Sequence, residues 1–498
     1  MRTYAIRTFG CQMNVHDSER AAGILETMGY RRTQDVADAS LVLLNTCAVR
    51  ENADNKLYGT LGHLKPLKDE HGTTIVVGGC LAQKDGATIT DRAPWVDVVY
   101  GTHNLANLPK LLEQADSAAL PVLEIVEQLE SFPSALPAKR DVRHHAWVSI
   151  SVGCNNSCTF CIVPSLRGPE NSRRLGDIVA EVQSLVADGV VEVTLLGQNV
   201  NSYGRDLDKR PMFAELLHAM GDVDGLERVR FTSPHPHDFT EDVLVAMAEV
   251  DNVCEHLHLP LQSGSDRVLR AMRRSYRSRR FLDLVERTRD LLPTASLTTD
   301  LIVGFPGETD QDFADTLDVV EAARFDQSFT FQYSPRPGTP AAEMVDDFVA
   351  PEVVAERYGR LEELTRRLSH EAHAALVGTT QQVLLESPSK TDPTRLSGRT
   401  RGNHLVHLPV PTTAPQVGGG GSDHWAPGDL VDVVITEAAT NYCIAGTPLA
   451  VERTAPGRAT ESAMASGDGW SLGPDAVLTP PVGHALPAGR QPLPVVGA

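Results

Sequence analysis

The chain has 498 residues, of which 41% are hydrophobic and 22% charged, and its formal net charge is -20. This composition predicts two to four globular domains, and no stretch approaches the ~20 consecutive apolar residues of a membrane helix. The acidic balance argues against bulk affinity for nucleic acid. Eight cysteines are too few for a disulfide scaffold in so long a chain, and no secretory signal is visible. We therefore expect a cytoplasmic protein with metal-binding cysteines and no membrane partner.

Residues 1–140 are predicted to form an α/β domain. Three apolar runs alternate with helical patterns, which favours a parallel, Rossmann-like sheet. The runs are residues 4–9, 41–44 and 75–77. A cysteine follows each run, namely Cys11, Cys47 and Cys80. Because ligands gather at the carboxyl ends of parallel strands, we predict that these cysteines converge. The alternative is three unrelated buried cysteines.

Residues 141–377 carry six apolar runs that alternate with helical patterns. The runs are residues 147–152, 191–196, 229–232, 256–261, 297–303 and 329–333. Six such units predict a partial (β/α)6 barrel, in which chemical groups lie at the carboxyl ends of the strands.

Three further cysteines, Cys154, Cys158 and Cys161, follow the first of these runs. Their spacing is too tight for a zinc site built from two Cys pairs, and no second pair lies nearby. Three thiolates can hold a 4Fe-4S cluster and leave one iron open, to which S-adenosylmethionine can bind for radical chemistry. Together with Phe160, this motif resembles the radical S-adenosylmethionine superfamily.

Residues 378–452 contain short alternating runs separated by turns, which predicts a small antiparallel β-barrel. The run Gly418-Gly419-Gly420-Gly421 is expected to be a loop of this barrel. Residues 453–498 are rich in Ala, Pro and Gly and are predicted to be a disordered tail.

Longer motifs narrow the resemblance to the methylthiotransferases. One such motif surrounds each of the first three cysteines, and three others lie in the barrel at residues 259–265, 299–309 and 333–342. The closing β-barrel resembles the RNA-binding TRAM domain. The resemblance covers about residues 1–452. Arg167, Gly168, Glu170, Ser172 and Arg173 follow a pattern similar to the MiaB-type branch, whereas Pro169 departs from it.

The resemblance implies an enzyme that adds a methylthio group to C2 of an N6-isopentenyladenosine beside the anticodon of tRNA. It implies two 4Fe-4S clusters, one on Cys154, Cys158 and Cys161 and an auxiliary one on Cys11, Cys47 and Cys80. Two S-adenosylmethionine molecules would serve as radical source and methyl donor. An electron donor such as flavodoxin or ferredoxin and a sulfur carrier or cluster-repair protein are the implied partners.

Other candidate residues follow from position and charge. Strand-end placement and the resemblance favour S-adenosylmethionine contacts at Phe160, Gln198, Asn199, Gln262, Asp300 and Gly304. Two basic segments are candidate RNA surfaces, with Arg273, Arg274 and Arg277 in the first and Arg399 and Arg401 in the second; solvated faces are the alternative. The run His235-Pro236-His237 is expected to be a surface loop.

Two other functions are compatible with parts of this pattern. The same chemistry can act on threonylcarbamoyl-adenosine in tRNA or on an aspartate of a ribosomal protein. A non-catalytic iron–sulfur RNA-binding protein is disfavoured, because such a module has no need for open irons.

Overall fold

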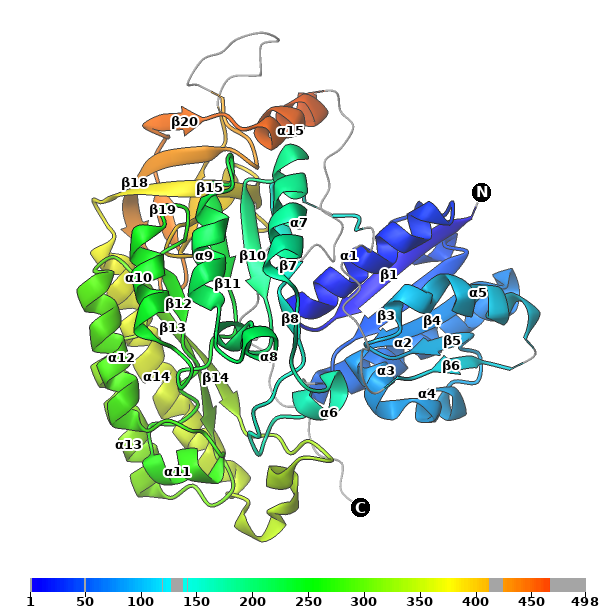
Figure 1. Cartoon of the computed structure of the whole chain (residues 1–498), viewed down its shortest axis with the longest axis horizontal. Helices are drawn as coiled ribbons and strands as arrows, with labels where there is room; N and C mark the ends of the chain where they lie inside the picture. Colours follow the sequence, from blue (N-terminus) through cyan, green and yellow to red (C-terminus); the bar gives the residue numbers. More distant parts are fainter. Residues whose placement is uncertain are drawn as a thin grey trace.

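The computed structural model describes residues 2–48, 51–118, 120–126, 138–140, 142–411 and 424–465, which form three bodies in chain order (Figure 1). The run Gly418-Gly419-Gly420-Gly421 and the residues beyond 465 lie outside the described residues. Within the described part, none of the helices combines the length and apolarity that crossing a membrane requires.

The N-terminal body is a six-stranded sheet in the order β2-β1-β3-β4-β5-β6, in which all neighbouring strands are parallel. Its strands are β1 (Thr3–Phe9), β2 (Arg31–Arg32), β3 (Leu41–Thr46), β4 (Thr74–Gly79), β5 (Val98–Tyr100) and β6 (Val122–Glu124). Its helices are α1 (Gln12–Thr27), α2 (Glu51–His71), α3 (Cys80–Asp85), α4 (Ala87–Arg92) and α5 (Leu108–Ser117). The predicted parallel α/β fold is confirmed.

Both faces of this sheet are covered, which explains why β3 reads as an unbroken apolar run. Leu43 packs with residues of α1 and α5 in one core, whereas Val42 packs with residues of α2 and α3 in another. Successive strand residues point to opposite faces, so both faces of β3 need apolar side chains.

The central body is a partial barrel of six main parallel strands, as predicted. The strands are β7 (His145–Ser149), β10 (Glu192–Leu196), β11 (Arg228–Phe231), β12 (His256–His258), β13 (Ser296–Val303) and β14 (Gln327–Gln332). They form two triplets, β11-β10-β7 and β12-β13-β14. A parallel bridge between Val229 and Val253 connects the triplets.

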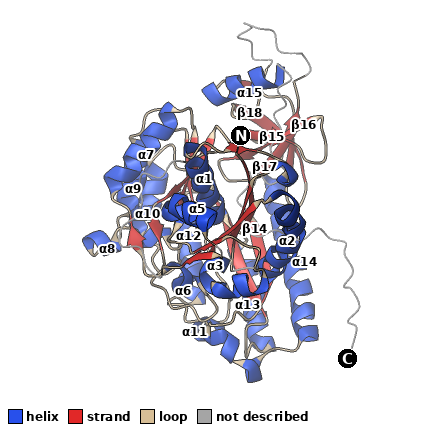
Figure 2. Cartoon of the chain, turned by 90° about the vertical axis from the view of Figure 1, so that its right-hand side faces the viewer, coloured by secondary structure: helices blue, strands red, loops and turns tan. Residues whose placement is uncertain are grey.

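Helices lie on the outside of these strands (Figure 2). They are α7 (Leu175–Ala187), α9 (Phe213–Gly221), α10 (Glu241–Glu249), α12 (Ser278–Leu291), α13 (Asp310–Ala323) and α14 (Pro351–Ala375), with shorter helices α6 (Val163–Arg167), α8 (Arg205–Asp208) and α11 (Asp266–Ala271) at the strand ends. A two-stranded ribbon of β8 (Ser151–Val152) and β9 (Asn171–Ser172) brackets the second cysteine set.

The C-terminal body is a closed five-stranded barrel with an added strand, β20. Its strands are β15 (Thr380–Pro388), β16 (Arg395–Thr400), β17 (Leu405–Pro409), β18 (Leu430–Ala438), β19 (Cys443–Ala445) and β20 (Ala450–Glu452). Pairing of β15 with β18 closes the barrel. The β17–β19 pairing is parallel, so the predicted antiparallel barrel is correct except at this pair.

The prediction that disorder begins at residue 453 is wrong for its first segment. Residues Ala455–Ala465 form the helix α15. Buried Asp429 accepts a hydrogen bond from the backbone N–H of Thr454 at 2.9 Å and pairs with Arg453 at 2.9 Å. These contacts fix the start of α15 on the barrel, which composition alone does not reveal.

Candidate active site

Cys11, Cys47 and Cys80 lie together at the carboxyl edge of the N-terminal sheet. The strand register aligns Phe9 with Thr46 and Thr46 with Gly79, so the residues that follow these three strand ends lie at the same level. A Cβ atom on Gly10 would lie 2.7 Å from the Cβ of Cys47, so only glycine fits there. A hydrogen bond with Cys47 lowers the pKa of the Cys11 thiol to about 6.

Two buried asparagines fix this arrangement. The Nδ2 of Asn45 donates to the backbone oxygen of Asn14 at 2.8 Å and to Oγ of Ser18 at 2.9 Å. In return, Nδ2 of Asn14 donates to the backbone oxygen of Thr46 at 3.3 Å. These bonds join the first turns of α1 to the end of β3, and they thereby set the position of Cys11 relative to Cys47.

Cys154, Cys158 and Cys161 lie in the single loop between β8 and α6, and all three are partly exposed. The backbone N–H of Cys154 donates to the oxygen of Gly168 at 3.1 Å. Gly153 has φ +84°, and a Cβ there would lie 2.1 Å from the oxygen of Pro169. The loop therefore closes on itself only with glycine before the first cysteine.

The same loop is anchored to the barrel through its middle. The backbone N–H of Thr159 donates to the oxygen of Met272 at 3.1 Å, and that of Ala341 donates to the oxygen of Thr159 at 2.9 Å. Phe160 packs against an apolar cluster that includes Met272 and Phe305. The second cysteine set is thus positioned by segments that follow β12 and β14.

Arg274 reaches the second cysteine set, which corrects its expected place on an open RNA-facing surface. The guanidinium is only 7% exposed, donates from Nη1 to Sγ of Cys158 at 3.4 Å and from Nη2 to the oxygen of Pro260 at 3.1 Å. Arg277 is partly buried and donates to the oxygen of Arg274 at 2.8 Å. Of the three, Arg273 is exposed.

Polar groups after β10 surround the start of the cysteine loop. Neither Oε1 of Gln198 nor Oδ1 of Asn199 has a hydrogen-bond partner, although both atoms are buried. Buried acceptors without donors are costly, so this pair favours a ligand that carries N–H groups. The amide nitrogen of Asn199 donates to Oδ2 of Asp238 at 2.8 Å.

Glu170 is a site residue that the sequence did not single out. Its backbone N–H donates to Oδ1 of Asn155 at 3.1 Å, and its carboxylate accepts from Oγ of Ser202 at 2.7 Å. Burial raises the pKa of Glu170 to about 7. His235 lies in the same neighbourhood, where it is buried and bonded to Asn201, so the expected surface loop is wrong at this residue.

Gln262 follows β12 and Gly304 directly follows β13, but Asp300 lies within β13, where it pairs with Phe329, so the expected strand-end position is wrong for Asp300. The backbone N–H of Gln262 donates to the oxygen of Asp300 at 2.8 Å, and Gln262 has a left-handed φ of 69°. Oδ2 of Asp300 lies 3.4 Å from Nε2 of His258. The backbone N–H of Gly304 donates to Oε2 of Glu308 at 2.9 Å.

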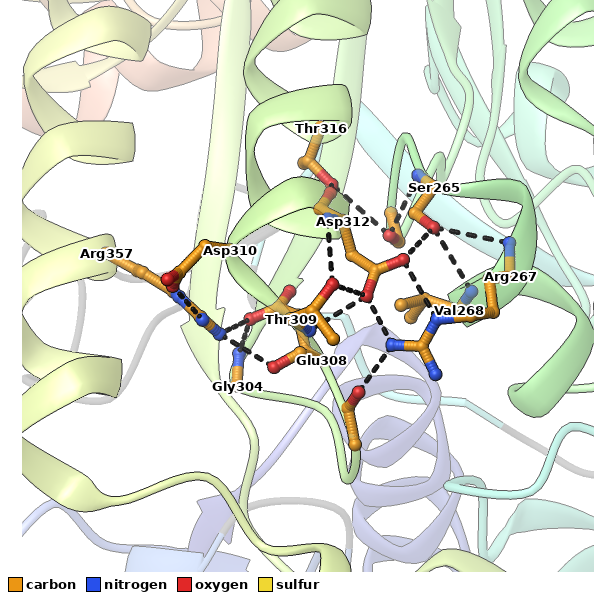
Figure 3. Close-up of polar contacts among 12 residues, drawn as sticks. Ser265, Arg267, Val268, Gly304, Glu308, Thr309, Asp310, Asp312, Thr316 and Arg357 are labelled. Atoms are coloured by element: carbon orange, nitrogen blue, oxygen red, sulfur yellow. Dashed lines mark hydrogen bonds and ion pairs between the residues drawn. The ribbon is translucent and has the colours of Figure 1, made fainter.

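A polar network fixes the loop after β13 to α11 (Figure 3). Arg357 pairs with the buried carboxylate of Glu308 at 2.9 Å, and Asp312 accepts from Oγ of Ser265 at 2.6 Å. Arg267 also pairs with Asp312. Since α11 leads directly to Met272, which anchors the cysteine loop, this network supports both that loop and the backbone at Gly304.

Arg399 and Arg401 lie at the seam between the central and C-terminal bodies, which also corrects their expected exposure. Arg401 pairs with Glu255 at 2.9 Å and donates to the backbone oxygen of Asp251 at 2.9 Å. Arg399 lies 3.5 Å from buried Glu386. The contacts of Arg401 join the two bodies, whereas Arg399 pairs with a neighbouring strand of its own barrel, so the two guanidiniums are occupied by protein partners.

The donor chemistry of the two cysteine sets fits iron–sulfur clusters. All eight cysteines lie in the described residues and none of them forms a disulfide, and Cys254 and Cys443 are buried apart from the two sets. In the part of the chain that the structure describes, no three His, Cys, Asp or Glu side chains close around a single ion. Each thiolate of a cubane binds a different iron atom, so wider spacing suits a cluster.

Comparison with known protein families agrees with this three-part organisation. Residues 3–101 match the family described as "Uncharacterized protein family UPF0004", residues 148–320 match the radical SAM superfamily, and residues 374–445 match the TRAM domain. The second match contains Cys154, Cys158 and Cys161, called the tight set below, and the first contains Cys11, Cys47 and Cys80, called the dispersed set.

Curated relatives extend over almost the whole chain. A protein of Clavibacter sepedonicus is 57% identical over 99% of this chain and 93% of its own length, and one of Parafrankia sp. is 58% identical over 95% and 93%. Both are named tRNA-2-methylthio-N(6)-dimethylallyladenosine synthase.

A solved structure shares the fold at much lower identity. The radical S-adenosylmethionine methyltransferase TsrM of Kitasatospora setae, solved with tryptophan and an S-adenosylmethionine analogue, aligns with a TM-score of 0.51 at 14% identity, over 69% of this chain and 75% of TsrM. With the full-length relatives, the fold and the two cysteine sets in view, the chain belongs to the tRNA-2-methylthio-N(6)-dimethylallyladenosine synthase family of radical S-adenosylmethionine methylthiotransferases.

Proposed function

We propose that this chain methylthiolates C2 of N6-isopentenyladenosine beside the anticodon of tRNA. The observation that carries the proposal is the presence of two separate sets of three cysteines outside any disulfide, each at the carboxyl edge of its own parallel sheet. The names of the full-length relatives favour this substrate over threonylcarbamoyl-adenosine or a ribosomal-protein aspartate.

The residues present fit the cofactors that this reaction needs. Cys154, Cys158 and Cys161 would hold the cluster that supplies the electron for cleaving one S-adenosylmethionine, and Cys11, Cys47 and Cys80 would hold the cluster that supplies the sulfur. The chain itself contributes the guanidinium of Arg274, which donates to Cys158. A positive hydrogen-bond donor there stabilises negative charge on the thiolate.

The chain's polar groups also fit S-adenosylmethionine beside the tight cysteine set. The unpartnered oxygens of Gln198 and Asn199 would accept N–H groups of the cofactor, and the ionised carboxylate of Glu170 would accept from its ammonium group. The backbone of the loop from Gly304 to Glu308, fixed by Arg357, would contact the adenine. Phe160 keeps the third cysteine against the barrel.

Recognition of tRNA rests on the TRAM domain and on the exposed part of the basic segment near Arg273. Sequence-specific RNA recognition uses splayed bases and local basic surfaces, so the acidic net charge does not oppose it. A flavodoxin or ferredoxin serves as electron donor, and a sulfur carrier or cluster-repair protein restores the auxiliary site. The presence of eight cysteines without a disulfide supports action in a reducing compartment, the cytoplasm.

The substrate is tested by deleting the gene and analysing digested tRNA by mass spectrometry. We expect the methylthio nucleoside to disappear and N6-isopentenyladenosine to accumulate, with both changes reversed by the intact gene. Loss of a methylthio derivative of threonylcarbamoyl-adenosine instead would contradict the proposed substrate and retain the chemistry.

A further inference from the structure

The helix α6 belongs in sequence to the central barrel but packs into the N-terminal body. Ile162 and Leu166 are 7% and 5% exposed and lie in the same apolar core as Cys80 and Leu81. Oγ1 of Thr102 donates to the backbone oxygen of Leu166 at 3.0 Å. The segment that leaves the tight cysteine set is therefore also part of the wall of the dispersed set.

Arg167, the last residue of α6, contacts the dispersed set through its side chain. The guanidinium is 5% exposed and donates from Nη2 to Oδ2 of Asp17 at 3.0 Å. Burial raises the pKa of the Cys80 thiol and a hydrogen bond with Cys47 lowers that of Cys11, and the positive charge of Arg167 acts on both thiols to lower the pKa. A buried guanidinium thus faces two of the three thiols of this set.

The backbone next to Arg167 contacts the other set. The oxygen of Gly168 accepts the N–H of Cys154 at 3.1 Å. The dipeptide Arg167-Gly168 therefore lies between both cysteine sets. The side chain of Arg167 faces the dispersed set, and the carbonyl oxygen of Gly168 accepts from Cys154 of the tight set.

We infer that Arg167 is a positioning residue that couples the two clusters, since it sets the charge around the Cys11, Cys47 and Cys80 cluster and fixes that set against the Cys154 loop. The inference rests on the proposed function, because it requires both clusters. A cation beside a cluster stabilises its reduced, more negative state and raises its reduction potential. Asp17 opposes this effect in part.

The test is an anaerobic redox titration of the reconstituted full chain, followed by electron paramagnetic resonance. For Arg167→Gln we expect the ratio of reduced to oxidised auxiliary cluster at a fixed potential to fall about tenfold, equivalent to ~59 mV for one electron. Arg167→Lys keeps the charge and should restore most of the ratio. Asp17→Asn removes the opposing charge and should shift the ratio the other way.

Arg274→Gln is the matched control, because it removes a guanidinium from Cys158 instead. Arg274→Gln should lower the reduction potential of the cluster on Cys154, Cys158 and Cys161 and leave the potential of the auxiliary cluster unchanged. An unchanged auxiliary potential in Arg167→Gln, or equal shifts in the Gln and Lys variants, would overturn the inference. Should Arg167→Gln fail to fold or to load, the two other variants decide. Arg167→Lys should leave the auxiliary potential near that of the wild type and Asp17→Asn should raise it, and an unchanged potential in Asp17→Asn would overturn the inference.

Failure of the proposed function is distinguishable from failure of this inference. Wild-type protein with one cluster would refute the two-cluster site, whatever the variants do. Two clusters whose potentials are insensitive to Arg167 and Asp17 would leave the function intact and refute the coupling alone.

Discussion

The two cysteine sets are assembled by different means. Cys154, Cys158 and Cys161 share one loop, which closes through a single backbone bond to Gly168 and is anchored by Met272. Cys11, Cys47 and Cys80 depend instead on the register of three strands and on the buried Asn14 and Asn45. The comparison teaches that one loop fixes the spacing of the first three cysteines, whereas the spacing of the other three depends on the register of their sheet.

The largest expected effect is the loss of iron from variants that lack one of the two cysteine sets. After anaerobic reconstitution, wild-type protein should bind about eight irons per chain, as two 4Fe-4S clusters require. Replacing the three cysteines of either set with alanine should leave about four. Loss of all iron from one of these variants would show that the two sites are not built independently.

The second effect concerns the support of the tight set. Arg357→Met leaves the carboxylate of Glu308 buried without its partner, because the side chains of the pair are 4% and 1% exposed. Breaking a buried pair costs about 3–5 kcal/mol, measured as a lower free energy of unfolding in urea. Arg360→Met is the control, since its pair with Glu356 is exposed and should cost at most about 1 kcal/mol. Equal effects of the two variants would refute the role given to this network.

The third effect concerns the support of the dispersed set. Asn45→Ala removes donors to Asn14 and Ser18 and leaves buried acceptors unpaired, which should cost about 1–3 kcal/mol. We expect the auxiliary cluster to be lost faster than the other on exposure to a chelator. Asn107→Ala, on the exposed end of the same body, is the control and should stay within ~0.5 kcal/mol. Retention of both clusters at wild-type rates in Asn45→Ala would contradict this account.

A fourth effect is a pH dependence at Glu170. Burial raises the pKa of this carboxyl from its ordinary value of 4.5 to about 7 in the folded state. The folded protein therefore favours the protonated form, and stability is lost as pH rises from about 4.5 to about 7. Relative to Glu170→Gln, the wild type should lose stability over that window in urea titrations of the cluster-free protein. A constant difference between the two proteins would show that Glu170 is not buried as described.

Much of this architecture was accessible from the sequence. Six apolar runs predicted the six barrel strands, and the cysteines that follow strands predicted both ligand sets. Strand periodicity and strand-end placement are local signals, so they can be read from the sequence. The direction of long side chains was not accessible. Arg274 and Arg273 are neighbours in one basic run, yet one is buried against Cys158 and the other is exposed.

The remaining misses share this cause. Arg399 and Arg401 pair with carboxylates of another strand or body, and His235 bonds to Asn201, which follows the neighbouring strand β10. The helix α15 depends on Asp429 of the barrel rather than on its own propensity. In each case a distant partner decides the placement, and no spacing in the sequence encodes that partner.

The central claim is that the two cysteine sets divide the chemistry between them. Its most direct test is a single-turnover assay with tRNA, S-adenosylmethionine and a chemical reductant, in which 5′-deoxyadenosine and the methylthio nucleoside are measured together. Cys47→Ala should still form 5′-deoxyadenosine without methylthio product, whereas Cys158→Ala should form neither. Methylthio product from Cys47→Ala, or 5′-deoxyadenosine from Cys158→Ala, would contradict the account.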